Sequence, residues 1–126
     1  MRALDTNVLV RLLVRDDPAQ VVKAETFVES GAWVSHVVLF ETLWVLDAVY
    51  ARTAKQIAKA IELLLNHNTL TLQDADVVAA ALAIFQRRPS LGFSDCMVLE
   101  IARKAGHLPL GTFDKGLGKL VDTHHL

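Results

Sequence analysis

Four acidic residues stand among apolar neighbours, where ordinary solvation does not account for them. Asp5 ends the short segment R-A-L-D, and Asp114 follows the segment L-P-L-G-T-F. Glu41 lies within V-V-L-F-E-T-L-W-V-L, and Asp95 lies within G-F-S-D-C-M-V-L. An ionised carboxylate is costly to remove from water unless it is paired or bound to a metal ion. Four such groups in one chain therefore indicate a bound cation.

The chemistry that such carboxylates serve is metal-assisted hydrolysis. Mg²⁺ and Mn²⁺ prefer oxygen ligands, and Mg²⁺ commonly combines a few carboxylates with waters and substrate phosphate oxygens. The metal charge activates water and stabilises the oxygen that leaves phosphorus. The four acids thus predict hydrolysis of a phosphodiester bond, with water rather than a side chain as the nucleophile.

Three of these acids, taken one at a time, also have a structural explanation. Asp is a favoured N-cap, so Asp5 alone could cap the first helix. Asp95 falls in the first turn of a predicted helix, where a negative charge interacts favourably with the helix dipole. Asp114 alone resembles a turn residue. Glu41 has no such explanation, because it lies inside an apolar helix, so the prediction of a site depends on the four acids together.

Short apolar segments alternate with helical patterns along the chain. Segments 2–5, 32–35, 69–72 and 108–113 are predicted strands. Predicted helices cover 8–14, 18–30, 37–51, 53–66, 74–87 and 95–105, with a helical turn near 114–120; Asp17, Thr53 and Ser94 are expected caps, and Gly106 is an expected stop. This order predicts an α/β fold with a small, mostly parallel central sheet flanked by helices. Because parallel strands end at one edge, the acids are expected there.

The composition favours one soluble domain. The chain has 126 residues, of which 52% are hydrophobic, and carries 14 acidic against 13 basic residues for a net charge of −1. The apolar content excludes a disordered chain, and the charge balance excludes a strongly basic nucleic-acid coat. No apolar run reaches the roughly 18 residues of a membrane span, and no secretory signal begins the sequence. The length of the chain predicts a single domain over residues 1–126. Cys96 is the one cysteine and cannot form an internal disulfide, so we expect the protein in the reducing cytoplasm.

Four short motifs around these acids resemble the PIN-domain family, and within it the VapC-type toxins of bacterial toxin–antitoxin pairs. They are L-D-T-N-V-L at Asp5, F-E-T at Glu41, F-S-D-C-M at Asp95 and T-F-D at Asp114, in the family's order and spread over nearly the whole chain. Each motif alone is common, whereas the four in this order are specific.

The resemblance implies a PIN-like α/β fold and a metal-dependent endoribonuclease that acts as a toxin. It implies that Asp5, Glu41, Asp95 and Asp114 form the acidic centre for Mg²⁺, or for Mn²⁺, with Asn7 and Thr112 as supporting polar groups. It also implies an RNA substrate, a small cognate antitoxin and a homodimer. Lys115, next to Asp114 in the sequence, is our candidate for a contact with a substrate phosphate.

Two other classes of protein remain open from the residues alone. A receiver-like signalling domain has the same length and α/β pattern, but it needs an acidic pair after the first strand, and here Asn7 follows Asp5 where a second acid would stand. The haloacid-dehalogenase-type phosphatases do not fit either, because they need an Asp at the position of Asn7. A catalytically inert PIN-type binding protein is the second alternative, which a metal titration separates from the nuclease.

Overall fold

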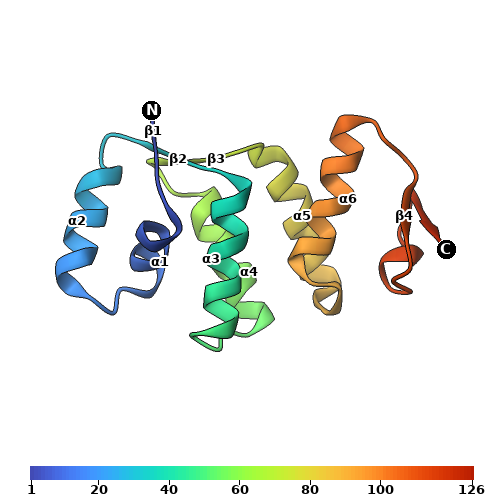
Figure 1. Ribbon diagram of the computed structural model, residues 1–126, viewed down its shortest axis with the longest axis horizontal. Helices are drawn as coiled ribbons and strands as arrows, with labels where there is room; N and C mark the ends of the chain where they lie inside the picture. The colour runs from blue at the N-terminus through green and yellow to red at the C-terminus, as the bar shows by residue number, and fades with distance from the viewer. The chain divides into compact units, whose positions relative to one another are not determined.

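The computed structural model describes residues 1–126 and consists of two compact units, an N-terminal unit of Met1–Ala75 and a C-terminal unit of Asp76–Leu126 (Figure 1). Six α-helices and five short strands alternate along the chain, and every strand pairing is parallel. The predicted α/β class with parallel strands is therefore confirmed.

The N-terminal unit is a three-stranded sheet with four helices. Its elements are β1 (Arg2–Ala3), α1 (Thr6–Val14), α2 (Pro18–Val28), β2 (Ala32–Val34), α3 (His36–Ala48), α4 (Ala54–Leu65) and β3 (Leu70–Leu72). Local sequence sets several of these boundaries. Asp17 caps α2 ahead of Pro18, and Thr53 forms a capping box with Gln56 at the start of α4, both as expected.

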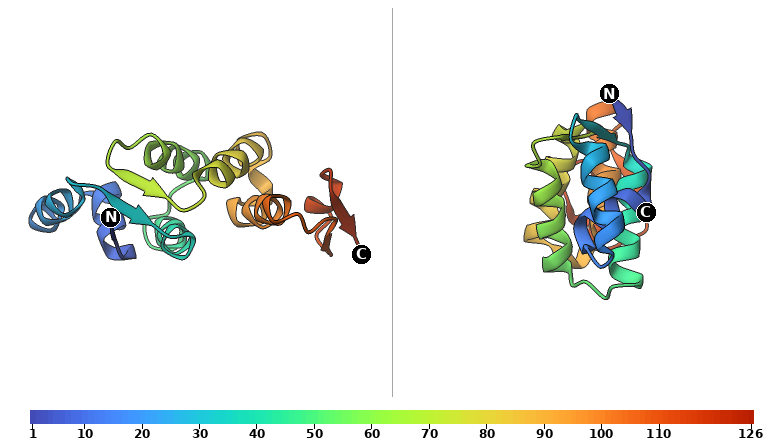
Figure 2. Two further views of the ribbon diagram at one scale, coloured as in Figure 1. Left: turned by 90° about the horizontal axis from the view of Figure 1, so that it is seen from above. Right: turned by 90° about the vertical axis from the view of Figure 1, so that its left-hand side faces the viewer.

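The strands of this unit lie side by side in the order β1-β2-β3 (Figure 2). Ala3 lies opposite Trp33, and Val34 lies opposite Leu72. The ladder continues past the strands through the Leu4 N–H, which donates to the Trp33 carbonyl, and the Gln73 N–H, which donates to the Val34 carbonyl. All three strands therefore end at one edge of the sheet, where α1 and α3 begin. This edge carries Asp5.

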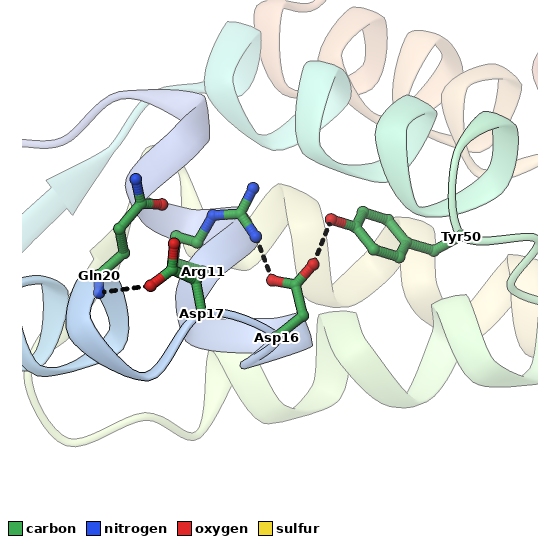
Figure 3. A network of polar contacts seen from close by, with 5 residues as sticks. All are labelled: Arg11, Asp16, Asp17, Gln20 and Tyr50. Carbon is green, nitrogen blue, oxygen red and sulfur yellow. Dashed lines mark hydrogen bonds and ion pairs between the residues drawn. The ribbon is translucent and has the colours of Figure 1, made fainter.

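A polar network fixes the far end of α1 (Figure 3). Asp16 accepts from the Arg11 guanidinium and, at 3.0 Å, from the Tyr50 hydroxyl, while Asp17 accepts from the Gln20 N–H at 3.1 Å. The Tyr50 hydrogen bond and the Arg11 charge hold the pKa of Asp16 below its usual value. The network ties α1 to the turn that precedes α2 and to the residues that follow α3.

The C-terminal unit begins with two helices and ends in a two-stranded sheet. Its elements are α5 (Ala75–Arg87, beginning at the unit boundary), the 3₁₀ turn η1 (Pro89–Leu91), α6 (Phe93–Ala105), β4 (Leu110–Thr112), the 3₁₀ turn η2 (Leu117–Lys119) and β5 (Thr123–His125). The rings of Phe85 on α5 and Phe93 on α6 meet edge-to-face with centroids 6.0 Å apart. Gly106 ends α6 in the left-handed conformation, as expected.

The structure corrects the expected elements in several places. Strand β1 ends at Ala3 rather than at Asp5, and helix α1 begins at Thr6 rather than at Val8. Helix α6 begins at Phe93, so Ser94 lies in its first turn and Gly92 occupies the cap position without a side-chain hydrogen bond. Helix α3 ends at Ala48 rather than Ala51, because Ala51 adopts a left-handed conformation with φ of 51°. The strand predicted over 108–113 is β4, which does not join the three-stranded sheet as expected but pairs with β5 in a second sheet. The polar sequence T-H-H of β5 did not indicate a strand.

The core of the N-terminal unit is expected to depend strongly on Leu64. Its side chain on α4 is 2% exposed, whereas that of the adjacent Leu63 is 53% exposed. We expect Leu64→Ala to lower the free energy of unfolding by about 3 kcal/mol through lost burial and the cavity left behind. Leu63→Ala should lower it by less than about 0.5 kcal/mol. Urea denaturation of both variants compares them, and equal losses would contradict this account of the core.

Candidate functional site

Asp5 occupies the cap position of α1, at the edge where the strands of the N-terminal unit end. Its backbone is extended, with φ of −95° and ψ of 165°, and its Oδ1 accepts from the Thr6 N–H at 2.7 Å. The side chain is exposed. Asp5 is therefore a helix cap, as its structural explanation predicted. This role uses only Oδ1, so it does not exclude a metal ligand at Oδ2.

Glu41 lies on α3 and, contrary to expectation, is exposed. Its apolar neighbours in the sequence predict that it is withdrawn from water. Val37 and Trp44, one turn before and after it, are themselves 64% and 67% exposed. Helix α3 is apolar on its outer face as well as its inner one, so apolar spacing around Glu41 did not mean burial. Desolvation is thus no evidence for a metal at this residue.

Thr6 links the two acids of the N-terminal unit. Its backbone N–H donates to Asp5, and its hydroxyl donates to Glu41 Oε2 at 3.0 Å. Two carboxylates that are far apart in the sequence are therefore held by the same residue. Nothing in the sequence distinguishes Thr6, because a threonine at the start of a helix is ordinary and only the fold brings it against Glu41.

Asp95 and Asp114 form the corresponding pair of the C-terminal unit. Asp95 is half-buried in the first turn of α6, and burial raises the pKa of its carboxyl, with the negative charge of Asp114 adding to the rise. Asp114 is exposed, and its Oδ2 accepts from the Leu117 N–H at 2.7 Å ahead of η2. The negative charges of Asp95 and Asp114 therefore oppose each other, and a cation held by both would relieve this repulsion.

The predicted supporting residues differ in their contacts. The Thr112 hydroxyl accepts from the Asp114 N–H at 3.0 Å, so it fixes the backbone that carries this acid. Asn7 is exposed beside Asp5 and makes no hydrogen bond to Asp5 or Glu41. Lys115 is exposed next to Asp114 and forms no ion pair within its unit. Its charge is thus free to meet an anion.

The donor set fits a hard divalent cation. None of the four acids forms an ion pair with a basic residue of its own unit, whereas Asp16, Glu25, Glu62, Asp76, Glu100 and Asp122 do. Each unit thus carries two of the candidate carboxylates without a basic partner, although Asp17, Glu29 and Asp47 of the N-terminal unit form no ion pair either. Only oxygen donors are present, which suits Mg²⁺ or Mn²⁺ and not the softer metals. Neither unit alone gathers three or more groups of the kind that hold a metal ion.

Cys96, the neighbour of Asp95, takes no part in this chemistry. It is fully buried, and burial together with the nearby acids raises the pKa of its thiol to about 11. The thiol therefore stays protonated at neutral pH and is a poor nucleophile.

The structure thus defines a parallel α/β protein with carboxylates at a sheet edge and at a helix start. A comparison with family models identifies the particular family: the PIN domain model matches residues 2–122. The chain belongs to the PIN-domain family. Members are generally nucleases that act on nucleic acid, and they generally use divalent metal ions.

The match spans both units, and all four acids lie within it. No curated protein matches the chain. None of its helices has the length and apolar character needed to cross a bilayer.

Proposed function

We propose that this protein is a metal-dependent endoribonuclease, with Asp5, Glu41, Asp95 and Asp114 as its catalytic and metal-binding residues. The observation that carries the proposal is the presence of two carboxylate pairs, one in each unit of a PIN domain, that no basic side chain neutralises. A bound Mg²⁺ or Mn²⁺ would supply Lewis-acid chemistry, which stabilises negative charge on a phosphate group during hydrolysis.

The chain's own residues would bind and orient the reactants. The four carboxylates supply the oxygen ligands, and Thr112 keeps Asp114 in place through its backbone. Lys115 would contact a phosphate of the RNA, and Asn7 would offer its amide to the substrate or to a water beside Asp5. The receiver-like alternative is not favoured by the PIN match.

Removal of divalent metal is expected to abolish cleavage. Protein dialysed against EDTA should cut a labelled RNA at least about 100-fold more slowly than the same protein with added Mn²⁺ or Mg²⁺, because the developing phosphate charge then lacks its electrostatic partner. Gel analysis of the RNA measures the rate. An Asp5→Asn/Asp95→Asn double variant, purified in parallel, controls for a contaminating ribonuclease.

The same experiment separates the nuclease from a catalytically inert PIN-type protein. Equal cleavage with and without metal, or equal cleavage by the double variant, would contradict the proposal. Binding of Mn²⁺ without any cleavage would favour the inert alternative.

We further propose that the protein is the toxin of a toxin–antitoxin pair, of the VapC type, acting in the cytoplasm as a homodimer with a small cognate antitoxin. The motif resemblance around the four acids supports this assignment. Induced expression should arrest growth in the wild type and not in Asp5→Asn, and sequencing of RNA ends would show which RNA is cut. Unimpaired growth with an active nuclease would contradict the toxin role alone.

A further inference from the structure

Thr6 is the first residue of α1 and is 8% exposed, next to two exposed acids. It is one of two polar residues that are buried in the structure, the other being Thr42 on α3. Buried hydroxyl groups need hydrogen-bond partners. The two threonines satisfy this need differently, and the difference indicates what Thr6 does.

The Thr42 hydroxyl donates to the Val38 carbonyl at 2.7 Å, one turn back in its own helix. This is the common local arrangement for a helical threonine. The Thr6 hydroxyl instead donates to the carboxylate of Glu41 on another helix, at 3.0 Å. A hydroxyl carries one proton, so this bond commits the Thr6 hydrogen to Glu41 Oε2 and leaves Oε1 without it.

The Thr6 backbone N–H makes the second link, to Asp5 Oδ1 at 2.7 Å. One residue thus holds one oxygen of each carboxylate and leaves the other oxygen of each free of these bonds. Glu41 is an exposed side chain with several rotatable bonds, and ordering it from a free state costs conformational entropy. The bond from buried Thr6 orders it before any ligand arrives.

We propose that Thr6 is a positioning residue that presents Glu41 Oε1 and Asp5 Oδ2 to a divalent cation. The inference rests on the proposed function, since it assumes that these two acids bind metal. Residues that orient metal ligands by hydrogen bonds typically change metal affinity by about 10- to 100-fold when they are lost.

The experiment compares Thr6→Val, which keeps the shape of the side chain and removes the hydroxyl, with Thr6→Ser, which keeps the hydroxyl. Thr42→Val is the matched control, because it removes a buried hydroxyl beside Glu41 that does not contact the carboxylate. Calorimetric titration with Mn²⁺ measures the dissociation constant, and urea denaturation verifies the fold. The Mn²⁺ concentration that gives half-maximal RNA cleavage is a second readout.

Thr6→Val is expected to weaken Mn²⁺ binding by about 10-fold or more, with Thr6→Ser and Thr42→Val close to the wild type. Wild-type affinity in Thr6→Val would overturn the inference and leave the nuclease assignment standing. Equal weakening in Thr6→Ser and Thr6→Val would also overturn it, because the hydroxyl would then not be the cause. A wild-type protein that neither binds Mn²⁺ nor cleaves RNA would overturn the proposed function itself, together with this inference.

Discussion

Asp5→Asn is expected to reduce metal-dependent RNA cleavage by about 100-fold or more while leaving the fold intact. Asn is as good an N-cap as Asp, and its side-chain oxygen can still accept from the Thr6 N–H at the start of α1. What the substitution removes is the negative charge, and with it an anionic oxygen for the cation. Cleavage rates at saturating Mn²⁺, together with thermal denaturation, measure the two effects separately.

Asp17→Asn is the matched control for this prediction. Asp17 is also an aspartate at a helix cap of the N-terminal unit, where it accepts from the Gln20 N–H. The same chemical change there should leave cleavage within about twofold of the wild type, since a surface substitution outside a site changes little. Equal loss of activity in both variants, or full activity in Asp5→Asn, would remove Asp5 from the proposed site.

Asp95→Asn is expected to reduce cleavage by a similar factor of about 100 and, unlike Asp5→Asn, to make the metal-free protein more stable. Burial and the charge of Asp114 raise the pKa of Asp95, so its ionised form is disfavoured in the folded state relative to the unfolded state. A carboxyl whose pKa is raised by folding lowers stability as the pH rises through its unfolded and folded pKa values. The neutral amide escapes this penalty at pH 7.

Thermal melts of the metal-free protein at pH 7 and pH 3 check the sign. The gain from Asp95→Asn should be present at pH 7 and should disappear at pH 3, where the wild-type carboxyl is protonated. Asp76→Asn is the control in the first turn of α5. The Lys104 ammonium lowers the pKa of Asp76, so this variant should give no gain at pH 7. A lower melting temperature for Asp95→Asn at pH 7 would contradict the prediction.

Local signals predicted most elements of this fold, and the exceptions depend on longer contacts. Asp17, Thr53 and Gly106 mark helix ends by the hydrogen bonds or backbone conformation that their residue types favour, and the structure uses them so. Ala51, in contrast, adopts a left-handed conformation that alanine rarely takes. The residue type at this position therefore did not predict the end of α3. Strand β5 consists of polar residues, so its pairing with β4 is set by the fold and not by an apolar pattern.

The candidate acids were found by residue type and position, whereas their surroundings were not. The expectation that apolar neighbours bury Glu41 is wrong, because Val37 and Trp44 face outward with it. Asp95 is the one acid of the four that is withdrawn from water, and its half-burial agrees with the sequence argument. The contact of Thr6 with Glu41 joins residues that lie far apart in the chain, so only the packing of α1 against α3 creates it.

The exposed indole of Trp44 allows metal binding at the candidate site to be followed by tryptophan fluorescence. The chain has two tryptophans, Trp44 one turn after Glu41 on α3 and Trp33 on β2. In a Trp33→Phe background, the tryptophan emission, excited at a wavelength that Tyr50 does not absorb, would come from Trp44 alone. A paramagnetic ion such as Mn²⁺ held at Glu41 would quench that emission, whereas diamagnetic Mg²⁺ would not. The outward apolar face of α3 thus supplies an intrinsic fluorescent reporter beside Glu41.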